Sequence, residues 1–400
     1  MKAFEPASIG TLHLKNRIIR SATHEGMSDE KGYPRRDLTD LYVRLAKGEA
    51  GAIITGVVAV QANGRLAANQ AMFHGDEYIQ LFQETNAELQ EYGTPLVLQI
   101  GHAGANTLMK VTGHPAVAPS PYKWPLNLQY ARALTEEEIQ EVIESFVQAI
   151  IRAKEARFKA VELHAAHGYL LHQFLSPRTN RRVDGWGGST KNRFRIVKEI
   201  VQRARDKVGD YPILVKHSAY DYEKSGISLD EGVTVAELMQ EVGVDAVEVS
   251  CGGILGAPSA VRWPRFPIEA MMEYTPQLKA LPVLKRLAVR SALKLSRKAR
   301  SPLHTYNVPA AERIKRNVHI PVIVTGGIRR LSEIEDIIGS DRADFVSLCR
   351  PFVIEPNIVQ KLRSGQQAES RCINCGYCLF GVASNGLRCY YGKLRRSGNP

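Results

Sequence analysis

The amino-acid sequence predicts a (β/α)8 TIM barrel of the α/β class, followed by a cysteine-rich C-terminal extension. Eight short β-branched or aliphatic runs recur along the chain, and each is followed by a polar loop and a helical pattern. The runs are apolar throughout, as expected for parallel strands that helices cover on the outside. Eight such units within about 350 residues fit a single barrel domain.

The predicted strands can be placed in chain order. They span residues 18–22, 52–55, 95–100, 160–163, 212–216, 246–249, 321–325 and 345–348. The helices between them are supported by their ends: Thr135 precedes three glutamates and an apolar pattern of helical spacing, which is typical of a helix N-terminus. We expect the barrel to occupy residues 1–365, with a basic helical insertion at about 253–310 and a cysteine-rich segment at 366–400.

Composition narrows the class of protein. A chain of 400 residues with 44% hydrophobic and 24% charged content is an ordinary folded protein. It lacks any run of 18 apolar residues and a signal-peptide pattern, so a cytoplasmic location is expected. The net charge of +12 is uneven, because residues 281–300 hold seven Lys/Arg and no acid. Nucleic acid is therefore not the expected partner, although a basic surface attracts polyanions.

The stretch ELHAAHGYLLHQFLSP, Glu162 to Pro177, follows the fourth predicted strand. In a (β/α)8 barrel, catalytic groups lie just beyond the carboxyl ends of the strands. His164, His167 and Tyr169 would therefore stand together at the barrel mouth. A single histidine is more often a helix-surface residue, and His172 is interpreted as structural.

Other strand ends carry matching polar groups. Gln99 lies at the end of the third strand and Lys216 at the end of the fifth. Gly326 and Gly327 follow the seventh strand, and Arg350 follows the eighth. Glycines near an arginine and a helix start are typical of a phosphate site in these loops, although a glycine pair alone also serves a tight turn.

These residues belong to blocks that resemble a known family. HAAHGYLLHQFLSPRTNRRVDGWGGSTKNR is similar to the signature of the old yellow enzyme family of flavin-dependent ene-reductases. LKNRIIRSATHEG, PLVLQIGHAG, HPAVAPSP and PVIVTGGI are similar to further family blocks and occur in the same order. The resemblance covers about residues 3 to 365.

The resemblance implies FMN at the barrel mouth, with NADH or NADPH as electron donor. Gln99 would hydrogen-bond the pyrimidine edge, and Lys216 would place a cation near N1 and O2. Gly326, Gly327, Cys349 and Arg350 would hold the phosphate. The flavin would also be lined by Ala22, Thr23 and Gly56.

The sequence departs from the family at one cofactor position. Lys216 stands where the family usually has arginine, so the charge is kept but the two-pronged geometry is lost. The motif SATHEG is closer to the 2,4-dienoyl-CoA reductase and trimethylamine dehydrogenase branch and implies that His24 lies near the substrate. Those relatives continue into further domains that are not expected in these 400 residues.

The resemblance implies a reaction on an α,β-unsaturated carbonyl compound. His164 and His167 would donate hydrogen bonds to the carbonyl oxygen, hydride would come from flavin N5, and Tyr169 would supply the proton. Two alternatives stay open. They are an amine dehydrogenase or demethylase, which needs an aromatic cage, and an RNA-acting flavoprotein, which usually has a catalytic cysteine in a barrel loop.

Four cysteines crowd the C-terminal segment. Cys372, Cys375, Cys378 and Cys389 form a CxxCxxC pattern with a fourth, distant cysteine. This density favours a metal site over a disulfide framework. The branch relatives carry a [4Fe-4S] cluster here, with three residues between the second and third cysteines instead of two. Zinc and packed reduced thiols therefore remain alternatives to iron–sulfur.

The basic insertion is expected to be amphipathic. In LPVLKRLAVRSALKLSRKAR, Leu281, Leu284, Leu287, Ala288, Ala292 and Leu295 lie on one helical stripe. A lid or a protein interface is favoured over a membrane anchor. We also expect a small enone or enoyl substrate, a homo-oligomer, and a separate electron-transfer subunit if a cluster is present.

Overall fold

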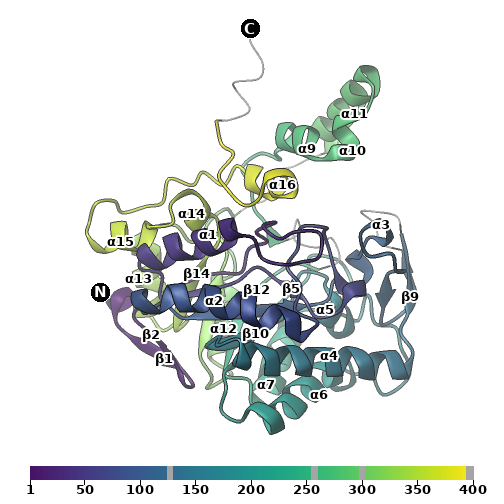
Figure 1. The fold of residues 1–400 in the computed structure, drawn as a ribbon, viewed down its shortest axis with the longest axis horizontal. Coiled ribbons are helices and arrows are strands. Elements are labelled where there is room, and N and C mark those ends of the chain that lie inside the picture. Colours follow the sequence, from purple (N-terminus) through teal and green to yellow (C-terminus); the bar gives the residue numbers. More distant parts are fainter. Residues whose placement is uncertain (124–128, 254–259, 297–301, 393–400) are drawn as a thin grey trace.

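A computed structural model describes residues 1–123, 129–253, 260–296 and 302–392. Within these residues, eight parallel strands close into a barrel surrounded by helices, as predicted (Figure 1). The barrel strands are β3 (Ile18–Arg20), β4 (Ala52–Ile54), β6 (Leu96–Gly101), β10 (Ala160–Ala165), β11 (Ile213–Ser218), β12 (Ala246–Ser250), β13 (Val322–Thr325) and β14 (Phe345–Leu348).

Two pairings close the barrel. The last strand, β14, pairs in parallel with the first, β3, so that Val346 lies opposite Ile18. Strand β10 pairs with both β6 and β11. All eight predicted strands are confirmed, with ends that differ by one or two residues, because hydrogen-bonded pairing and not apolarity ends each strand.

The inward side chains form layers along the barrel axis, because successive residues of a strand point to opposite faces. One layer is apolar and includes Ile19, Ala160, Leu214, Ala246 and Phe345. Two residues further along the strands the inward layer turns polar. That second layer contains Ser21, Gln99, Glu162, Lys216, Glu248 and Ser347, which interact with one another.

Helices cover the outside of the barrel. The outer helices are α1 (Arg36–Lys47), α2 (Ile79–Leu89), α4 (Glu136–Glu155), α6 (Thr190–Val208), α7 (Leu229–Glu241), α12 (Val308–Lys315), α13 (Leu331–Gly339) and α15 (Ile358–Arg363). Helix α4 begins as predicted. Thr135 accepts a hydrogen bond from the Glu138 backbone, and the Glu138 side chain accepts one from the Thr135 backbone, which completes a capping box.

Short elements decorate both ends of the barrel. The hairpin of β1 and β2 buries Ile9, Leu12 and Leu14 in the same cluster as the apolar barrel layer and so covers the lower end. The short strands are β1 (Ala7–Ile9), β2 (Leu12–Leu14), β5 (Val58–Ala59), β7 (Val117–Ala118), β8 (Tyr122–Lys123) and β9 (Tyr130–Ala133). The short helices are η1 (Lys2–Phe4), η2 (Ala62–Gly64), η3 (Asp76–Tyr78), η4 (Gln90–Tyr92), η5 (Gly104–Asn106), α3 (Met109–Thr112), α5 (Leu170–Leu175) and α14 (Arg350–Ile354).

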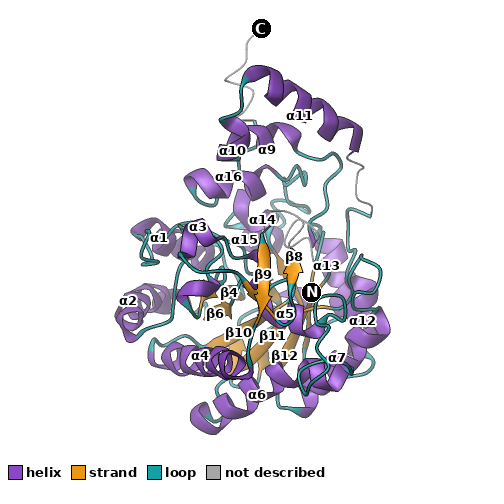
Figure 2. Ribbon diagram, turned by 90° about the vertical axis from the view of Figure 1, so that its right-hand side faces the viewer, coloured by secondary structure: helices purple, strands orange, loops and turns teal. Residues whose placement is uncertain are grey.

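The insertion after β12 and the C-terminal segment lie together above the barrel. The insertion forms α9 (Ile268–Tyr274), α10 (Pro276–Lys279) and α11 (Val283–Ser296), and the C-terminal segment forms α16 (Tyr377–Asn385). In both ribbon views α16 lies between the barrel and the insertion helices, and α11 projects away from the barrel (Figures 1 and 2). Parts of the predicted insertion (254–259 and 297–301) and of the predicted C-terminal segment (393–400) lie outside the described residues.

Helix α11 presents apolar side chains to solvent. Leu284 is 82% exposed and Leu287 52% exposed. Arg290, one turn after Leu287, forms an ion pair with Glu269 of α9 at 2.6 Å. Among the described residues, every helix is too short or too polar to cross a membrane.

Candidate active site

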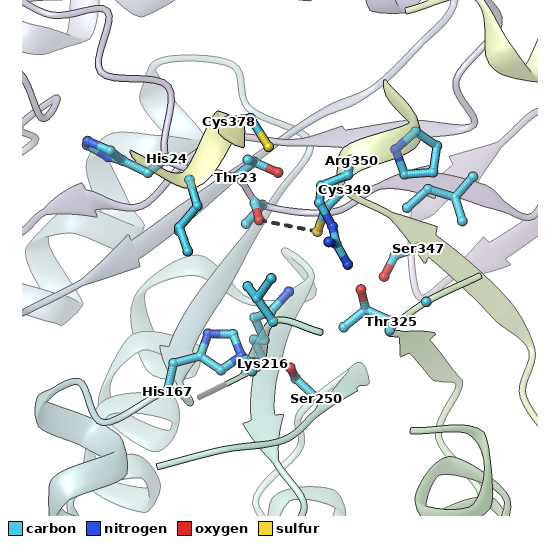
Figure 3. Close-up of a pocket in the computed structure, with 18 of the residues that line it drawn as sticks. Thr23, His24, His167, Lys216, Ser250, Thr325, Ser347, Cys349, Arg350 and Cys378 are labelled. Carbon is cyan, nitrogen blue, oxygen red and sulfur yellow. Dashed lines mark hydrogen bonds between the residues drawn. The ribbon is translucent and has the colours of Figure 1, made fainter. Parts of the chain in front are cut away.

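A cavity of about 210 Å³ opens at the carboxyl ends of the barrel strands (Figure 3). It is lined by most of the residues predicted to bind cofactor or substrate. These are Ala22, Thr23, His24, Gln99, His164, His167, Tyr169, Lys216, Gly326, Gly327, Cys349 and Arg350. Residues far apart in the sequence therefore meet at one barrel end, because each follows a parallel strand.

Gly56 is an exception among the predicted cofactor residues. It lines a small neighbouring cavity, together with His24 and Glu25, instead of the main one. Its backbone N–H donates a 2.8 Å hydrogen bond to Oε1 of the buried Glu25, and a side chain at this position would collide with that carboxylate. The glycine is thus needed for close approach of Glu25, and its contact with the cofactor stays a prediction.

The three residues of the HxxHGY motif form one cluster. The His164 ring lies 4.5 Å from the Tyr169 ring and 5.2 Å from the His167 ring, measured between centroids. His164 Nδ1 is buried and has no hydrogen-bond partner among the described residues. His167 Nε2 lies 2.7 Å from Ser250 Oγ, so this ring is already oriented by β12. The sequence motif alone gives the two imidazoles the same role, whereas the structure shows that their surroundings differ.

Burial keeps this cluster uncharged. Burial lowers the pKa of His164 well below its ordinary value, and the nearby Lys216 charge lowers it further. Burial, followed by His164 and Lys216, does the same for the pKa of His167. Burial raises the pKa of Tyr169 to about 12. Two neutral imidazoles and one neutral phenol can bind an oxygen atom and supply a proton near neutral pH.

His172 holds the loop that carries this cluster. Its Nδ1 accepts a 2.9 Å hydrogen bond from the Gly168 backbone, and its Nε2 lies 3.1 Å from Asp221 Oδ1. The Gly168 carbonyl in turn accepts hydrogen bonds from Asn106 at 2.8 Å and Gln173 at 2.6 Å. Such a support is needed because His167 and Gly168 both have positive φ, of 58° and 73°. His172 is structural, as predicted, and acts directly behind the site.

Lys216 forms an ion pair inside the barrel. Its Nζ lies 2.7 Å from Glu248 Oε2 and donates to Ser21 Oγ at 2.9 Å. Lys216 is nevertheless part of the cavity wall, on the same side as His167 and Ser250 (Figure 3). Burial lowers the pKa of Lys216, but its pKa lies above the ordinary value, chiefly because of the negative charge of Glu248, so the side chain stays charged. The cation that the sequence predicted at this place therefore has a buried counter-ion.

The glycine pair after β13 permits a close backbone approach. Gly326 has φ of 130° and Gly327 has φ of 76°, a region that side chains disfavour. A Cβ at Gly326 would meet Tyr306 and Asn307, and one at Gly327 would meet the Leu303 carbonyl. Side chains are thus excluded at these two positions, and both glycines line the cavity, where a glycine-rich turn is typical of a phosphate site.

The charge of the wall fits FMN. Among the described residues that line the cavity, none is aspartate or glutamate, whereas Lys216, Arg329 and Arg350 are cations. Arg350 follows β14 and donates a hydrogen bond to the Arg262 carbonyl at 2.8 Å, which fixes its side chain at the wall. A phosphate dianion and an isoalloxazine that becomes negative on reduction both match this wall.

The four clustered cysteines come together at one small cavity. Cys372, Cys375, Cys378 and Cys389 line one small cavity, and Cys378 also lines the main one. Burial raises the pKa of Cys378 to about 12, and burial also raises the pKa of Cys372 and Cys375. Within the described residues, no group of three or more His, Cys, Asp or Glu side chains is placed to hold a metal ion. The predicted metal, iron–sulfur or zinc, therefore finds no support.

The sequence interpretation missed several parts of the site. Ser250 orients His167, and the hydroxyl of Tyr306 donates to the Ala260 carbonyl at the cavity wall. Val382 and Leu387 of the C-terminal segment also line the cavity, so this segment covers the barrel mouth. Ser250 and Glu248 could have been found by the alternation of inward residues on β12, whereas nothing local marks Val382 or Leu387.

Comparison with known proteins is consistent with this site. The NADH:flavin oxidoreductase / NADH oxidase family matches residues 2–279 and 265–369. A NADH oxidase of Thermoanaerobacter brockii is 36% identical over 402 residues, covering 99% of this chain and 56% of that protein. A NADPH dehydrogenase of Geobacillus sp. (strain WCH70) is 32% identical over 354 residues, covering 88% of this chain and 91% of that protein.

Similarity to a solved structure extends over nearly the whole fold. The structure of a 2-naphthoyl-CoA reductase in complex with 2-naphthoyl-CoA superposes with a TM-score of 0.82 at 22% identity. The similar region covers 96% of this chain and 56% of that one. At this identity the likeness shows the fold alone. The chain thus spans just over half the length of two of these three proteins and nearly the full length of the third.

Proposed function

The chain belongs to the NADH:flavin oxidoreductase / NADH oxidase family, and we propose that it reduces the C=C bond of an α,β-unsaturated carbonyl compound. NADH or NADPH and FMN are the cofactors that this family implies. When bound, FMN would accept hydride from the nicotinamide and deliver it from N5 to the alkene. The observation that carries the proposal is a single cavity that joins a wall of glycines and arginine to the uncharged cluster of His164, His167 and Tyr169. Among the described residues that line this cavity, none is aspartate or glutamate.

The flavin would be held by two walls of this cavity. Gly326, Gly327, Cys349 and Arg350 would hold the phosphate through backbone N–H groups and the guanidinium. The Ala22 and Thr23 backbone, Gln99 and Lys216 would meet the ring system, as in the family the chain resembles. Gln99 already donates to Glu162 through Nε2, at 2.5 Å, which fixes the amide orientation.

The histidines would bind the substrate carbonyl. His164 Nδ1 is a buried nitrogen without a partner among the described residues, so an incoming carbonyl oxygen would satisfy it when this nitrogen carries the proton. Hydrogen bonds from His164 and His167 would stabilise negative charge on that oxygen. Loss of one such donor typically raises the activation free energy by about 2.7 to 4 kcal/mol. His24 lines the same cavity and would contact the remainder of the substrate.

Tyr169 would supply the proton to the α-carbon. Its ring is nine-tenths buried and stacks against His164. Because burial raises its pKa to about 12, the phenol stays protonated at neutral pH. A weak acid suffices here, since the enolate formed by hydride addition is a stronger base. Reduction thus needs one hydride and one proton per alkene.

The aromatic side chains near the cavity favour an alkene substrate over an amine substrate. The guanidinium of Arg262 stacks between Tyr222 and Tyr306, with centroid distances of 4.7 and 5.0 Å. A substrate ammonium ion needs the faces of such rings, and here an arginine already occupies them. Amine dehydrogenation remains the alternative, and the RNA-acting alternative gains no specific support from this site.

Reconstitution tests the proposal. Purified protein is titrated with FMN, and NADH or NADPH oxidation is then followed without oxygen, with and without 2-cyclohexen-1-one. We expect stoichiometric FMN binding and alkene-dependent oxidation. Failure to bind FMN, or oxidation with an amine but not with the alkene, would overturn the proposal.

A further inference from the structure

Lys216 and Glu248 form a buried ion pair. The lysine side chain is 3% exposed and the glutamate 0%. Glu248 Oε2 accepts from Lys216 at 2.7 Å, and Glu248 Oε1 accepts from Ser21 at 2.6 Å and from Ser347 at 2.5 Å. Every oxygen of this carboxylate thus has a donor. Burial alone would raise the pKa of Glu248, but Lys216 and these donors lower it, so the group is ionised.

A second carboxyl, Glu162, lies beside the pair and is uncharged. Its Oε2 accepts from Gln99, its Oε1 has no donor among the described residues, and its carboxyl interacts with that of Glu248. Burial and the negative charge of Glu248 both raise the pKa of Glu162, so a proton carried by Glu162 satisfies the contact between the two carboxyls.

The other strands bring no further charge into this layer. The remaining inward residues are Ser21, Ile54, Gln99, Thr325 and Ser347, which are uncharged. At the mouth, His164 is neutral and Cys349 is a partly buried thiol. The layer therefore holds one lysine cation, one glutamate anion and one protonated glutamic acid, with a net charge of zero.

We propose that Glu248 acts as a positioning residue that cancels the cation of Lys216 and so lowers the reduction potential of the flavin bound above it. The inference rests on the proposed function, because it requires FMN at the cavity. A reduced flavin is negative near N1, and a nearby cation stabilises that charge in proportion to its uncompensated field. With its counter-ion 2.7 Å away, Lys216 presents a dipole instead of a full charge.

Charge-changing variants test the inference through the midpoint potential of the bound flavin. Glu248→Gln is made in the Glu162→Gln background, so that no second carboxyl can ionise beside the lysine. This variant leaves Lys216 uncompensated and is expected to favour two-electron reduction at least tenfold, a rise of about 30 mV relative to Glu162→Gln. Lys216→Gln is expected to lower the potential by at least as much. The double variant Lys216→Gln/Glu248→Gln restores zero net charge and should return close to the wild-type potential.

Glu162→Gln is the matched control, because it replaces a neutral acid with a neutral amide of the same size beside the same partners. Its flavin potential should differ from that of the wild type by less than the change of about 30 mV expected for loss of the Glu248 charge. The protonated acid can also be seen without flavin. The infrared C=O band of a buried carboxylic acid should be present in the wild-type apoprotein and absent in Glu162→Gln.

Folding and flavin binding are measured on every variant by circular dichroism and FMN titration. The double variant, which leaves neither charge unpaired, keeps the test informative if Glu248→Gln does not fold. Equal potentials in Glu162→Gln/Glu248→Gln and Glu162→Gln, or in the double variant and Lys216→Gln, would overturn the inference while FMN binding upholds the proposed function. A wild-type protein that binds no FMN would overturn both.

Discussion

The two nitrogens of His172 can be separated by substitution. Asparagine places its oxygen near the position of Nδ1, where Gly168 N–H donates at 2.9 Å, but cannot reach Asp221. Glutamine places its amide nitrogen near the position of Nε2, so it keeps a donor for Asp221 but leaves Gly168 N–H without an acceptor. His172→Asn and His172→Gln therefore remove opposite halves of the same support.

The magnitudes follow from what each variant leaves unpaired. In His172→Asn, Asp221 keeps donors from Ser176 Oγ and Ile227 N, both at 3.0 Å, so we expect a loss of about 1–3 kcal/mol in the free energy of unfolding. In His172→Gln the loss of unfolding free energy is similar. The unpaired group is then the N–H of Gly168, which has positive φ and lies between His167 and Tyr169. A shift of about 1 Å there is expected to lower kcat up to about 100-fold.

The stability loss in His172→Asn should also depend on pH. Burial raises the pKa of Asp221, but His172 and the hydrogen bonds lower it by more, so its folded pKa lies below the ordinary value. A lowered carboxyl pKa contributes stability above the unfolded pKa of about 3.9, and this stability is lost as pH falls through the folded pKa. The difference between wild type and His172→Asn should therefore shrink in acid.

Urea unfolding at several pH values and kcat for alkene reduction, measured on FMN-saturated protein, provide the two readouts. We expect His172→Asn to lose stability and keep most of its activity, and His172→Gln to lose activity with little change in FMN affinity. If both variants lose activity equally, the hydrogen bond to Gly168 does not orient the cluster, and the reasoning is refuted.

Three further predictions concern separate parts of the molecule. Tyr169→Phe should retain FMN binding and NAD(P)H oxidation with oxygen but slow alkene reduction. Single-turnover kinetics with the alkene measure this rate, and an unchanged rate would show that Tyr169 is not the proton donor. Gly327→Ala should weaken FMN binding and lower the free energy of unfolding by about 1–3 kcal/mol, because φ is 76° and the new methyl group meets the Leu303 carbonyl; FMN titration and urea unfolding check it, and an unchanged affinity would argue against a phosphate at this wall. Thr135→Ala should cost about 1 kcal/mol by removing the capping box with Glu138 while leaving FMN affinity as it is, and Thr135→Ser should restore most of the loss in urea unfolding.

The sequence by itself determined the barrel and the position of most site residues. Apolar runs such as residues 160–163 identify parallel strands because both faces of such strands are covered. Once the strands are placed, the barrel topology requires that residues after them, such as His164 and Lys216, meet at one end. The resemblance of the HxxHGY and TGGI blocks then gave these positions their expected roles.

Only the tertiary structure decided how those residues are paired. The sequence places Lys216 at the mouth, but the ion pair between its Nζ and Glu248 Oε2, at 2.7 Å, depends on which inward side chains of neighbouring strands share a layer. The same holds for Ser250 beside His167 and for Glu25 behind Gly56. The cover formed by Val382 and Leu387 depends on where the chain returns after the barrel. These contacts arise between segments distant in sequence, where no local pattern records the partner.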